Sequence, residues 1–460
     1  MRILNRLHER IGDFWWYSLM IFCAARAADV VNVFVGLWLV PKCVSPDELG
    51  AVQPLTSFAS FFAIPAGVFA TTFRQEISSL ATRREFGRMK SLMRGVFLVT
   101  AVFFFVALVL AKIVLPAYLE RLRVVEGSLG LVILAASFAG PVSAIYTNPL
   151  QVLKKFRATS AISILGAPIR FATMLIAMPF RALAGYFVGQ VSTPAFATAT
   201  SLFALRKELA VPAEPYWSRD VFTRFGRLFA LFGAGAVASG IASLVETTVI
   251  RQRLPEIDSA AYYIITRFSD MAGFVSGALC FTIFPYSAEL SAQGRNTNVL
   301  VAKASAAIAL SNAAIAVLLW AAGHSVLSIL PHGEEYSSFA WALPWIVSLA
   351  TLSSCTNLYC TAEMAANRFG YLAFMIPLNL LYAAALLFVT GFGYFRPWMP
   401  QAVTDFIEAH NVTSLHTMMM WMTVVALLRL AFCAYGAIAS QRRPMPKSDR
   451  ADRKSAGSGE

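Results

Sequence analysis

Residues 14–40, FWWYSLMIFCAARAADVVNVFVGLWLV, carry two charged side chains, Arg26 and Asp29, near the middle of an apolar run. The run is longer than the roughly 20 residues that a helix needs to cross about 30 Å of hydrocarbon. An ionised side chain at the centre of a bilayer costs about 3 kcal/mol or more. The stretch therefore predicts a membrane-spanning helix that borders a wet polar cavity.

The rest of the chain repeats this apolar pattern. Hydrophobic residues make up 58% of the 460 residues, charged residues 14%, and the mean hydropathy is +0.63. Soluble domains carry about 25% charged residues, so a soluble protein is excluded. Apolar runs of this length predict helices, because an open sheet cannot satisfy its backbone in lipid. We predict an all-α polytopic membrane protein with about 12 transmembrane helices, at 14–40, 51–73, 95–116, 129–149, 159–179, 183–205, 228–250, 262–284, 304–323, 337–358, 371–391 and 415–438.

The net charge of +13 is unevenly placed along the chain. With twelve spans and a cytoplasmic amino terminus, 26 Lys and Arg residues fall in cytoplasmic segments, seven in outer segments and five within spans. This asymmetry is the positive-inside pattern of membrane proteins. It predicts that both termini are cytoplasmic, and it explains the basic charge without a nucleic-acid partner.

The polar break at 206–227 divides the chain into two sets of six spans. We predict an N-terminal lobe at 1–205, a cytoplasmic linker at 206–227, a C-terminal lobe at 228–440 and a disordered tail at 441–460. A shift of 211 residues aligns the starts of the two halves, which indicates a parallel repeat about the membrane normal. The charged, amphipathic segment 73–94 predicts a helix that lies on the inner leaflet.

Four arginines within spans are candidates for an anion site: Arg26, Arg170, Arg267 and Arg429. A guanidinium group keeps its charge, and its fork matches phosphate oxygens bidentately. Several of them in one wet cavity would bind a phosphate group. The alternatives are an internal ion pair for Arg26 and Asp29, which share a helix face, and a side chain that reaches the interface for Arg170.

Two carboxylates within spans, Asp29 and Glu246, are candidates for a coupling cation. Glu246 has no cation nearby on its own helix, since Arg251 is five residues away. Such a carboxylate suits H+ or Na+ coupling. The alternative is a carboxyl group that is hydrogen-bonded to a neighbouring helix.

Three short patterns occur in a defined order. They are Asp47-Glu48-Leu49-Gly50 before the second span; Glu246, Pro255–Asp258 and Ala261-Tyr262 before the eighth; and Phe284-Pro285-Tyr286-Ser287 at its end. With the six-plus-six plan, they resemble the polysaccharide exporters of the multidrug/oligosaccharidyl-lipid/polysaccharide (MOP) exporter superfamily. Ala261 stands where that family commonly has Gly, and Glu246 where Asp is commoner. Related lipid II flippases have an adjacent Arg-Asp pair, whereas Arg26 and Asp29 are three residues apart.

The resemblance implies a MATE-like fold whose two six-helix lobes rock between inward- and outward-open states. The expected activity is flipping of a polyprenyl-diphosphate-linked oligosaccharide across the bacterial inner membrane. On this hypothesis the four arginines hold the diphosphate and sugars, and Asp29 or Glu246 binds H+ or Na+. Expected partners are the lipid-linked glycan, membrane lipids, a glycan polymerase and glycosyltransferases.

Two other functions are open from the sequence. A multidrug antiporter of the same superfamily would need an acidic, aromatic cleft, whereas the charges within these spans lean positive. An O-antigen-type polymerase or ligase would need a large outer loop, and the longest predicted outer loop, 391–414, is short. The chain has no Walker A loop, no metal-ligand pattern of His or Cys and no other enzyme signature. We therefore predict a transporter without a cofactor.

Overall fold

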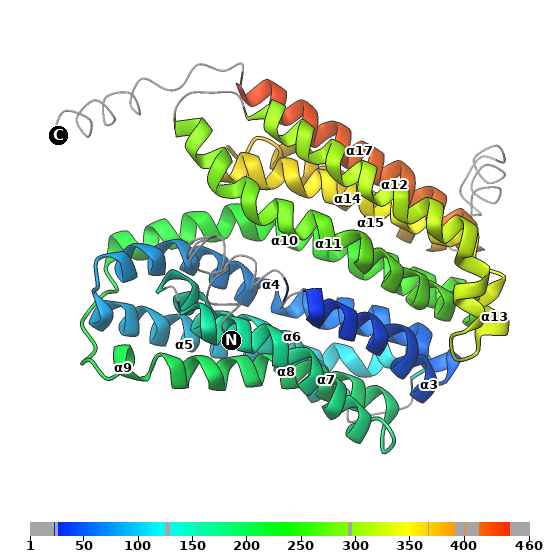
Figure 1. Ribbon diagram of the computed structural model, residues 1–460, viewed down its shortest axis with the longest axis horizontal. Helices are drawn as coiled ribbons and strands as arrows, with labels where there is room; N and C mark the ends of the chain where they lie inside the picture. Colours follow the sequence, from blue (N-terminus) through cyan, green and yellow to red (C-terminus); the bar gives the residue numbers. More distant parts are fainter. Residues whose placement is uncertain are drawn as a thin grey trace, which may run out of the picture.

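The computed structural model describes residue 23, residues 26–124, 129–153, 155–292, 297–366 and 368–391, residue 401, and residues 414–441. Every regular element in these ranges is a helix. The helices form two bundles, which lie together at the α3 and α13 end and diverge toward the end that carries α9 (Figure 1). Residues 14–22, 24 and 25 of the predicted span 14–40 lie outside the described residues, as do most of the predicted loop 391–414 and the tail from 442 onward.

The N-terminal bundle begins with residues 26–34, which are helical, and a π-helical turn η1 (Val35–Leu39). Further helices follow in chain order, each covering one predicted span except for the short α3 and α9. They are α3 (Val40–Cys43), α4 (Pro46–Thr82), α5 (Phe86–Arg121), α6 (Leu129–Val152), α7 (Phe156–Ala177), α8 (Ala182–Ala204) and α9 (Arg206–Leu209).

The C-terminal bundle begins at Ser218, whose hydroxyl accepts the amide hydrogen of Val221 at 3.4 Å and caps the first long helix. Such a cap satisfies one free amide at a helix start. The helices are α10 (Arg219–Arg253), α11 (Glu256–Ala292), α12 (Asn298–Ser328), α13 (Gly333–Ser337), α14 (Ala342–Ala365), α15 (Leu372–Gly391) and α17 (Leu415–Gln441).

The helix boundaries repeat between the two halves. Helices α4 and α11 both contain 37 residues, and their first residues, Pro46 and Glu256, stand 210 positions apart. The helices before them end at Cys43 and Arg253, again 210 positions apart. This spacing lies within one residue of the shift of 211 that aligns the two halves of the sequence.

Eight of the described helices are long and apolar enough to span a membrane, and they make the chain a multi-pass membrane protein. Helices α8, α11 and α14 cover the predicted spans 183–205, 262–284 and 337–358 but are not among the eight. Each of them packs against at least two other helices: α8 against α6 and α7, α11 against α4 and α14, and α14 against α12 and α17.

The prediction of a surface helix at 73–94 is wrong. Helix α4 continues to Thr82, and α5 begins at Phe86. The turn between them contains Arg84 with φ 58°, a left-handed conformation that ends helices. The apolar residues of this segment are buried in a cluster at the α9 end, with Phe73 and Met89 both 0% exposed. They form the core between two extended membrane helices, and they do not face lipid head groups.

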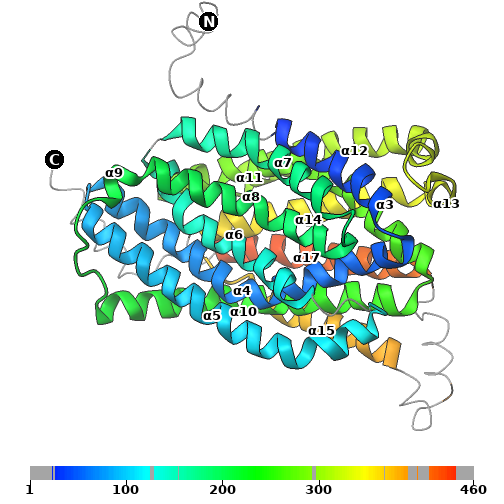
Figure 2. The same ribbon diagram turned by 90° about the horizontal axis from the view of Figure 1, so that it is seen from below.

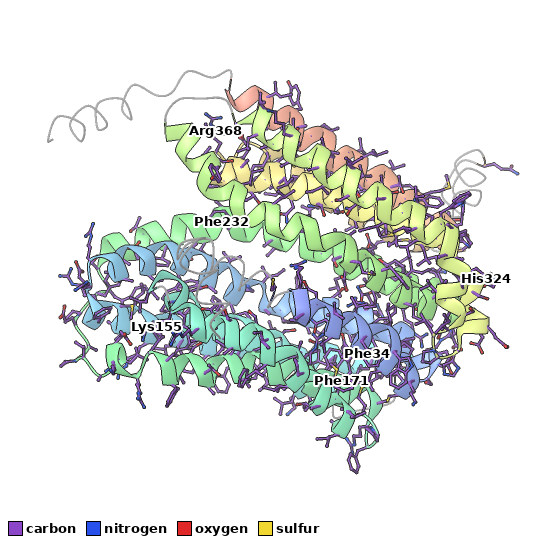
Figure 3. All side chains as sticks on the ribbon, viewed as in Figure 1. Phe34, Lys155, Phe171, Phe232, His324 and Arg368 are labelled. Atoms are coloured by element: carbon purple, nitrogen blue, oxygen red, sulfur yellow. The ribbon has the colours of Figure 1, made fainter. Side chains whose placement is uncertain are left out.

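Helix α4 connects the two bundles, since it packs against both α10 and α11. Near the α9 end, Phe69 of α4 stacks on Phe225 of α10 with ring centroids 5.9 Å apart. Lys155 and Arg368 lie at the end where the bundles diverge, and His324 lies at the opposite end (Figure 3). The molecule therefore has one closed end and one end at which the helices of the two bundles separate.

Candidate functional site

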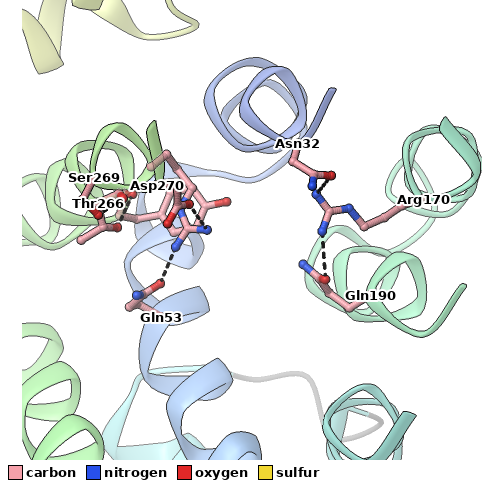
Figure 4. A network of polar contacts seen from close by, with 9 residues as sticks. Asn32, Gln53, Arg170, Gln190, Thr266, Ser269 and Asp270 are labelled. Carbon is pink, nitrogen blue, oxygen red and sulfur yellow. Dashed lines mark hydrogen bonds and ion pairs between the residues drawn. The ribbon is translucent and has the colours of Figure 1, made fainter. Parts of the chain in front are cut away.

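A cavity of about 390 Å³ lies between the bundles and is lined mainly by polar side chains. We call it the interbundle cavity. Its lining comes from the first helix, α7 and α8 of one bundle and from α11 of the other: Arg26, Asp29, Asn32, Val33, Val35, Gly36, Arg170, Tyr186, Gln190, Tyr263, Arg267, Ser269, Asp270 and Gly273. Figure 4 shows the side chains of Arg170 and Asp270 on opposite sides of the space between these helices.

Arg170 of α7 is held by two neutral amide groups. Its guanidinium donates to Oδ1 of Asn32, and Nη1 donates to Oε1 of Gln190 at 3.3 Å (Figure 4). Among the residues that the structure describes, no carboxylate lies within 4.0 Å of it. Amide oxygens fix the orientation of a guanidinium group but do not neutralise its charge. Arg170 therefore presents to the cavity a positive charge that no described carboxylate contacts directly.

The position of Arg170 depends on packing between two aromatic side chains. Phe34 on the first helix and Phe171 on α7 lie next to one another (Figure 3), with ring centroids 5.9 Å apart. Phe171 follows Arg170 directly and Phe34 is two residues after Asn32, so this contact holds the first helix and α7 together where Arg170 bonds to Asn32. Aromatic pairs at such distances stabilise packing by about 0.5–1.5 kcal/mol beyond burial.

Arg267 enters the cavity from α11 of the other bundle. Its Nη1 lies 3.2 Å from Oδ2 of Asp270, and its Nη2 donates to Oε1 of Gln53 on α4 at 3.2 Å. Its guanidinium carbon lies 5.1 Å from the ring centroid of Tyr263, which is within the range of a cation–π contact. Arg267 thus joins the two bundles, because Gln53 belongs to the N-terminal one.

Gly36 makes room for the side chain of Arg267. A Cβ atom at position 36 would lie 2.8 Å from Cδ of Arg267, closer than van der Waals contact allows. Gly36 belongs to the π-helical turn η1, and single π turns often occur at functional sites. The absence of a side chain at Gly36 lets the first helix approach α11 at the cavity.

Arg26 and Asp29 form an ion pair on one helix face, with Nη2 3.0 Å from Oδ2. Both side chains remain partly exposed, at 30% and 28%, and both line the interbundle cavity. Asp29 therefore compensates Arg26 while both remain accessible from the cavity.

A second cavity, of about 640 Å³, lies within the C-terminal bundle and contains Glu246 and Arg429. We call it the C-terminal cavity. The carboxylate of Glu246 accepts hydrogen bonds from the hydroxyls of Tyr382, at 2.8 Å, and Tyr262, at 3.4 Å. The guanidinium carbon of Arg429 lies 5.7 Å from the ring centroid of Tyr382. Two donors therefore already point at the Glu246 carboxylate.

The structure brings together three of the four predicted arginines. Arg26, Arg170 and Arg267 line the interbundle cavity with Asp29, whereas Arg429 lies with Glu246 in the C-terminal cavity. The sequence analysis did not identify the amides Asn32, Gln53 and Gln190, which orient the arginines. Their polar character within otherwise apolar spans was the signal that could have identified them. Within the described residues, no group of three or more His, Cys, Asp and Glu is placed to hold a metal ion.

No family model and no curated protein sequence matches this chain. Solved structures do. An outward-facing MATE-family multidrug resistance transporter of the MOP superfamily aligns with TM-score 0.64 and 11% identity over 94% of this chain and 98% of its own. The lipid II flippase MurJ, in an inward closed conformation, aligns with TM-score 0.56 and 12% identity over 91% of this chain and 86% of its own.

A third structure is a MOP superfamily transporter from Pyrococcus furiosus, described as having a binding pocket of reverse polarity. It aligns with TM-score 0.57 and 10% identity over 93% of this chain and 95% of its own. The chain has the fold of MOP superfamily transporters. The predicted MATE-like, all-α architecture is therefore confirmed.

Proposed function

We propose that this protein flips a polyprenyl-diphosphate-linked oligosaccharide from the inner to the outer leaflet by alternating access. In this proposal the diphosphate binds in the interbundle cavity between Arg26, Arg170 and Arg267, while the polyprenyl chain stays in lipid. One observation carries the proposal: guanidinium groups from both bundles line one cavity, and the hydrogen bonds that Arg170 makes with the described residues go to neutral amides. A diphosphate supplies the negative charge that this arrangement lacks.

The arrangement of the bundles supports loading from one side. The helices separate at the α9 end (Figure 1), which the distribution of basic residues assigns to the cytoplasm. A substrate made in the inner leaflet would enter there. A rocking motion that separates the other end would move Arg267 relative to Arg26 and Arg170, because they belong to different bundles. The hold on the phosphate would then weaken when the outer side opens.

The test is head-group translocation in proteoliposomes with a fluorescent polyprenyl-diphosphate oligosaccharide. We expect Arg170→Gln to lower the flipping rate about ten- to a hundredfold, since one hydrogen bond to a charged group contributes about 1.5–3 kcal/mol. Arg121→Gln is the matched control, because Arg121 is exposed at the end of α5 and lines neither cavity. Equal rates for Arg170→Gln and the unmodified protein would refute the diphosphate site.

Export of organic cations is a second candidate function. Asp29 and Asp270 line the interbundle cavity together with the aromatic rings of Tyr186 and Tyr263, and carboxylates with aromatic faces bind cations. The similarity in fold to a multidrug resistance MATE-family transporter also supports export as a candidate function. Transport of an organic cation that is lost in Asp270→Asn and unaffected by Arg170→Gln would favour export over flipping.

We propose Glu246 as the first candidate for a coupling carboxylate, with Asp29 as the second. The tyrosine hydroxyls donate hydrogen bonds to the Glu246 carboxylate and occupy lone pairs that a metal cation would need as ligands, whereas a proton needs only one lone pair. We therefore expect a pH gradient to drive flipping, and Glu246→Gln to remove that dependence. Flipping that follows a Na+ gradient at constant pH would contradict this assignment.

A further inference from the structure

A separate groove of about 520 Å³ runs along the N-terminal bundle and is almost entirely apolar. Helix α6 forms its floor, with Phe138 and Ala139, while α5 and α8 form its walls, with Phe97 and Phe104 on one side and Ala199 and Leu202 on the other. None of the described residues that line it is charged. Figure 2, viewed from below Figure 1, shows α5 and α8 on the side of the N-terminal bundle that faces away from the C-terminal bundle. The groove therefore faces lipid.

Small side chains create the space in this groove. Ala199 and Leu202 are exposed on one wall, and Phe97 is 43% exposed on the other. Phe104 and Phe138 pack edge to face beneath them, with ring centroids 5.3 Å apart. The exposed alanine leaves space between α5 and α8 in which one acyl chain can pack against the two aromatic rings and gain van der Waals contacts.

Two arginines stand at one end of the groove. Arg94 precedes Phe97 by three residues on α5, and Arg206 follows Leu202 by four residues at the start of α9. Arg94 shares a helix face with Phe97, because residues three apart lie on one face, and Arg206 begins α9 just after Leu205, where α8 has ended. Both arginines are exposed. This is the end of the molecule that the positive-inside pattern assigns to the cytoplasm.

The other contacts of α9 leave this basic end without acidic compensation from its own helix. Lys90, one turn before Arg94, donates to the carbonyl groups of Leu209 and Val211 at 2.5 and 3.0 Å and so fixes α9 against α5. Glu208, the acidic residue of α9, is bound by Nζ of Lys155 at 2.8 Å. Arg206 rests over the ring of Phe203, with its guanidinium carbon 4.7 Å from the ring centroid.

We propose that this groove is a binding site for an anionic phospholipid of the inner leaflet. One acyl chain lies between α5 and α8, and the phosphate head group is bound by Arg94 and Arg206. Basic pockets between membrane helices at the cytoplasmic surface bind head groups of this kind. The site is separate from both cavities and does not depend on the substrate that is transported.

The test is native mass spectrometry of the full-length protein in detergent, with dioleoyl phosphatidylglycerol and, in parallel, dioleoyl phosphatidylethanolamine. We expect the unmodified protein to retain phosphatidylglycerol more tightly. Arg94→Gln and Arg206→Gln should each weaken that retention about fivefold, from about 1 kcal/mol for each basic residue near the surface. The control is Arg157→Gln, an exposed arginine at the start of α7, which should leave retention unchanged.

A second pair of variants tests the acyl-chain groove. Ala199→Trp fills it and should reduce retention of both lipids, whereas Ala314→Trp, on the exposed face of α12, should not. Ala195→Leu gives the same test with a smaller change, and monodispersity with an unchanged melting temperature shows that each variant folds. Equal retention of the two lipids by the unmodified protein would overturn the proposal. Unchanged retention of both lipids by Ala199→Trp would also overturn it. The same holds if an added polyprenyl phosphate displaces phosphatidylglycerol from the unmodified protein.

Discussion

The two ends of the molecule differ in how the bundles contact one another. At the α13 end, polar groups join them directly: Arg251 Nε donates to the Leu122 carbonyl at 3.3 Å, and the Ser259 hydroxyl donates to the Gly50 carbonyl at 3.3 Å. Arg251 is only 7% exposed. The Leu122 carbonyl lies at the C-terminal end of α5, where carbonyls lack helical partners, and Pro54 leaves the Gly50 carbonyl without an amide donor. The closed end is therefore held by specific hydrogen bonds as well as by apolar packing.

At the α9 end, the hydrogen bonds stay on one side. Within the described residues, the linker before α10 bonds to the N-terminal bundle, as in the contacts of Tyr216 with Glu76 and of the Trp217 indole with the Ser91 carbonyl. Among described residues, no hydrogen bond joins this linker to α11–α17, and α10 packs against α4 through phenylalanine rings. These ring contacts include no hydrogen bond, so the bundles can rock about them without breaking one. This difference predicts that substitutions at the α13 end weaken the contact between the bundles more than substitutions at the α9 end.

The largest effect is expected for Gly50→Ala at the closed end. A Cβ atom there would lie 2.5 Å from Oγ of Ser259 and 3.1 Å from Nη1 of Arg251. Overpacking of this kind costs about 1–3 kcal/mol. The matched control is Gly67→Ala on the same helix, where a Cβ atom meets nothing within 4 Å and helix propensity adds up to about 1 kcal/mol. Thermal unfolding in detergent should separate the two variants, and equal melting temperatures would contradict the close approach at Gly50.

Tyr118→Phe should have the next largest effect. Its hydroxyl bonds to the Thr248 hydroxyl of α10 at 2.8 Å and to the Pro54 carbonyl at 3.3 Å. Loss of this group should cost about 1 kcal/mol of stability. Tyr435→Phe, at a ring that is 61% exposed, should change little. If both variants unfold at the temperature of the parent protein, the hydroxyl of Tyr118 does not hold the bundles together.

Much of the helical architecture could be predicted from the sequence, because apolar length alone specifies a membrane helix. The less apolar helices show the limit of that signal. Helices α8 and α14 are not among the eight long apolar helices, and each contributes a polar residue to a cavity: α8 contributes Gln190 and α14 Asn357. The polar side chains that form the cavities are the ones that lower the hydropathy. Weak spans in such a chain therefore indicate cavity-lining helices.

The candidate site could be predicted only in part. Each charge within a span was visible, since a charge in hydrocarbon is costly wherever it occurs. Which charges meet depends on helix rotation and packing between elements far apart in sequence. Arg267 and Gln53 meet because α11 packs on α4, whereas Arg429 faces the C-terminal cavity with Glu246. A pattern in one helix carries no information about that choice.

A smaller effect is expected from the exposed ion pair of the closed end. Arg123 Nη1 lies 3.2 Å from Glu256 Oε1, and the two side chains are 73% and 46% exposed. Exposed pairs contribute about 0.2–1 kcal/mol and lose strength with salt. A double-mutant cycle with Arg123→Gln and Glu256→Gln should give a coupling energy in this range that falls between low and high salt. A larger coupling that salt does not change would show that the pair is shielded from solvent.

The smallest effect concerns the α9 end and depends on pH. Burial alone would raise the pKa of Glu208, but its hydrogen bond to Lys155 and the charges of Lys155 and Lys207 outweigh burial and lower that pKa. A lowered carboxyl pKa stabilises the folded protein above the unfolded-state value of about 4.3. That stabilisation is lost as the pH falls through the lower, folded-state pKa, and solvent screening limits it to a few tenths of a kcal/mol. The difference in melting temperature between the parent protein and Glu208→Gln should therefore be constant from pH 7 to about pH 5 and shrink below about pH 4. A difference in melting temperature that grows as the pH falls would mean that Lys155 does not hold Glu208 in its charged form.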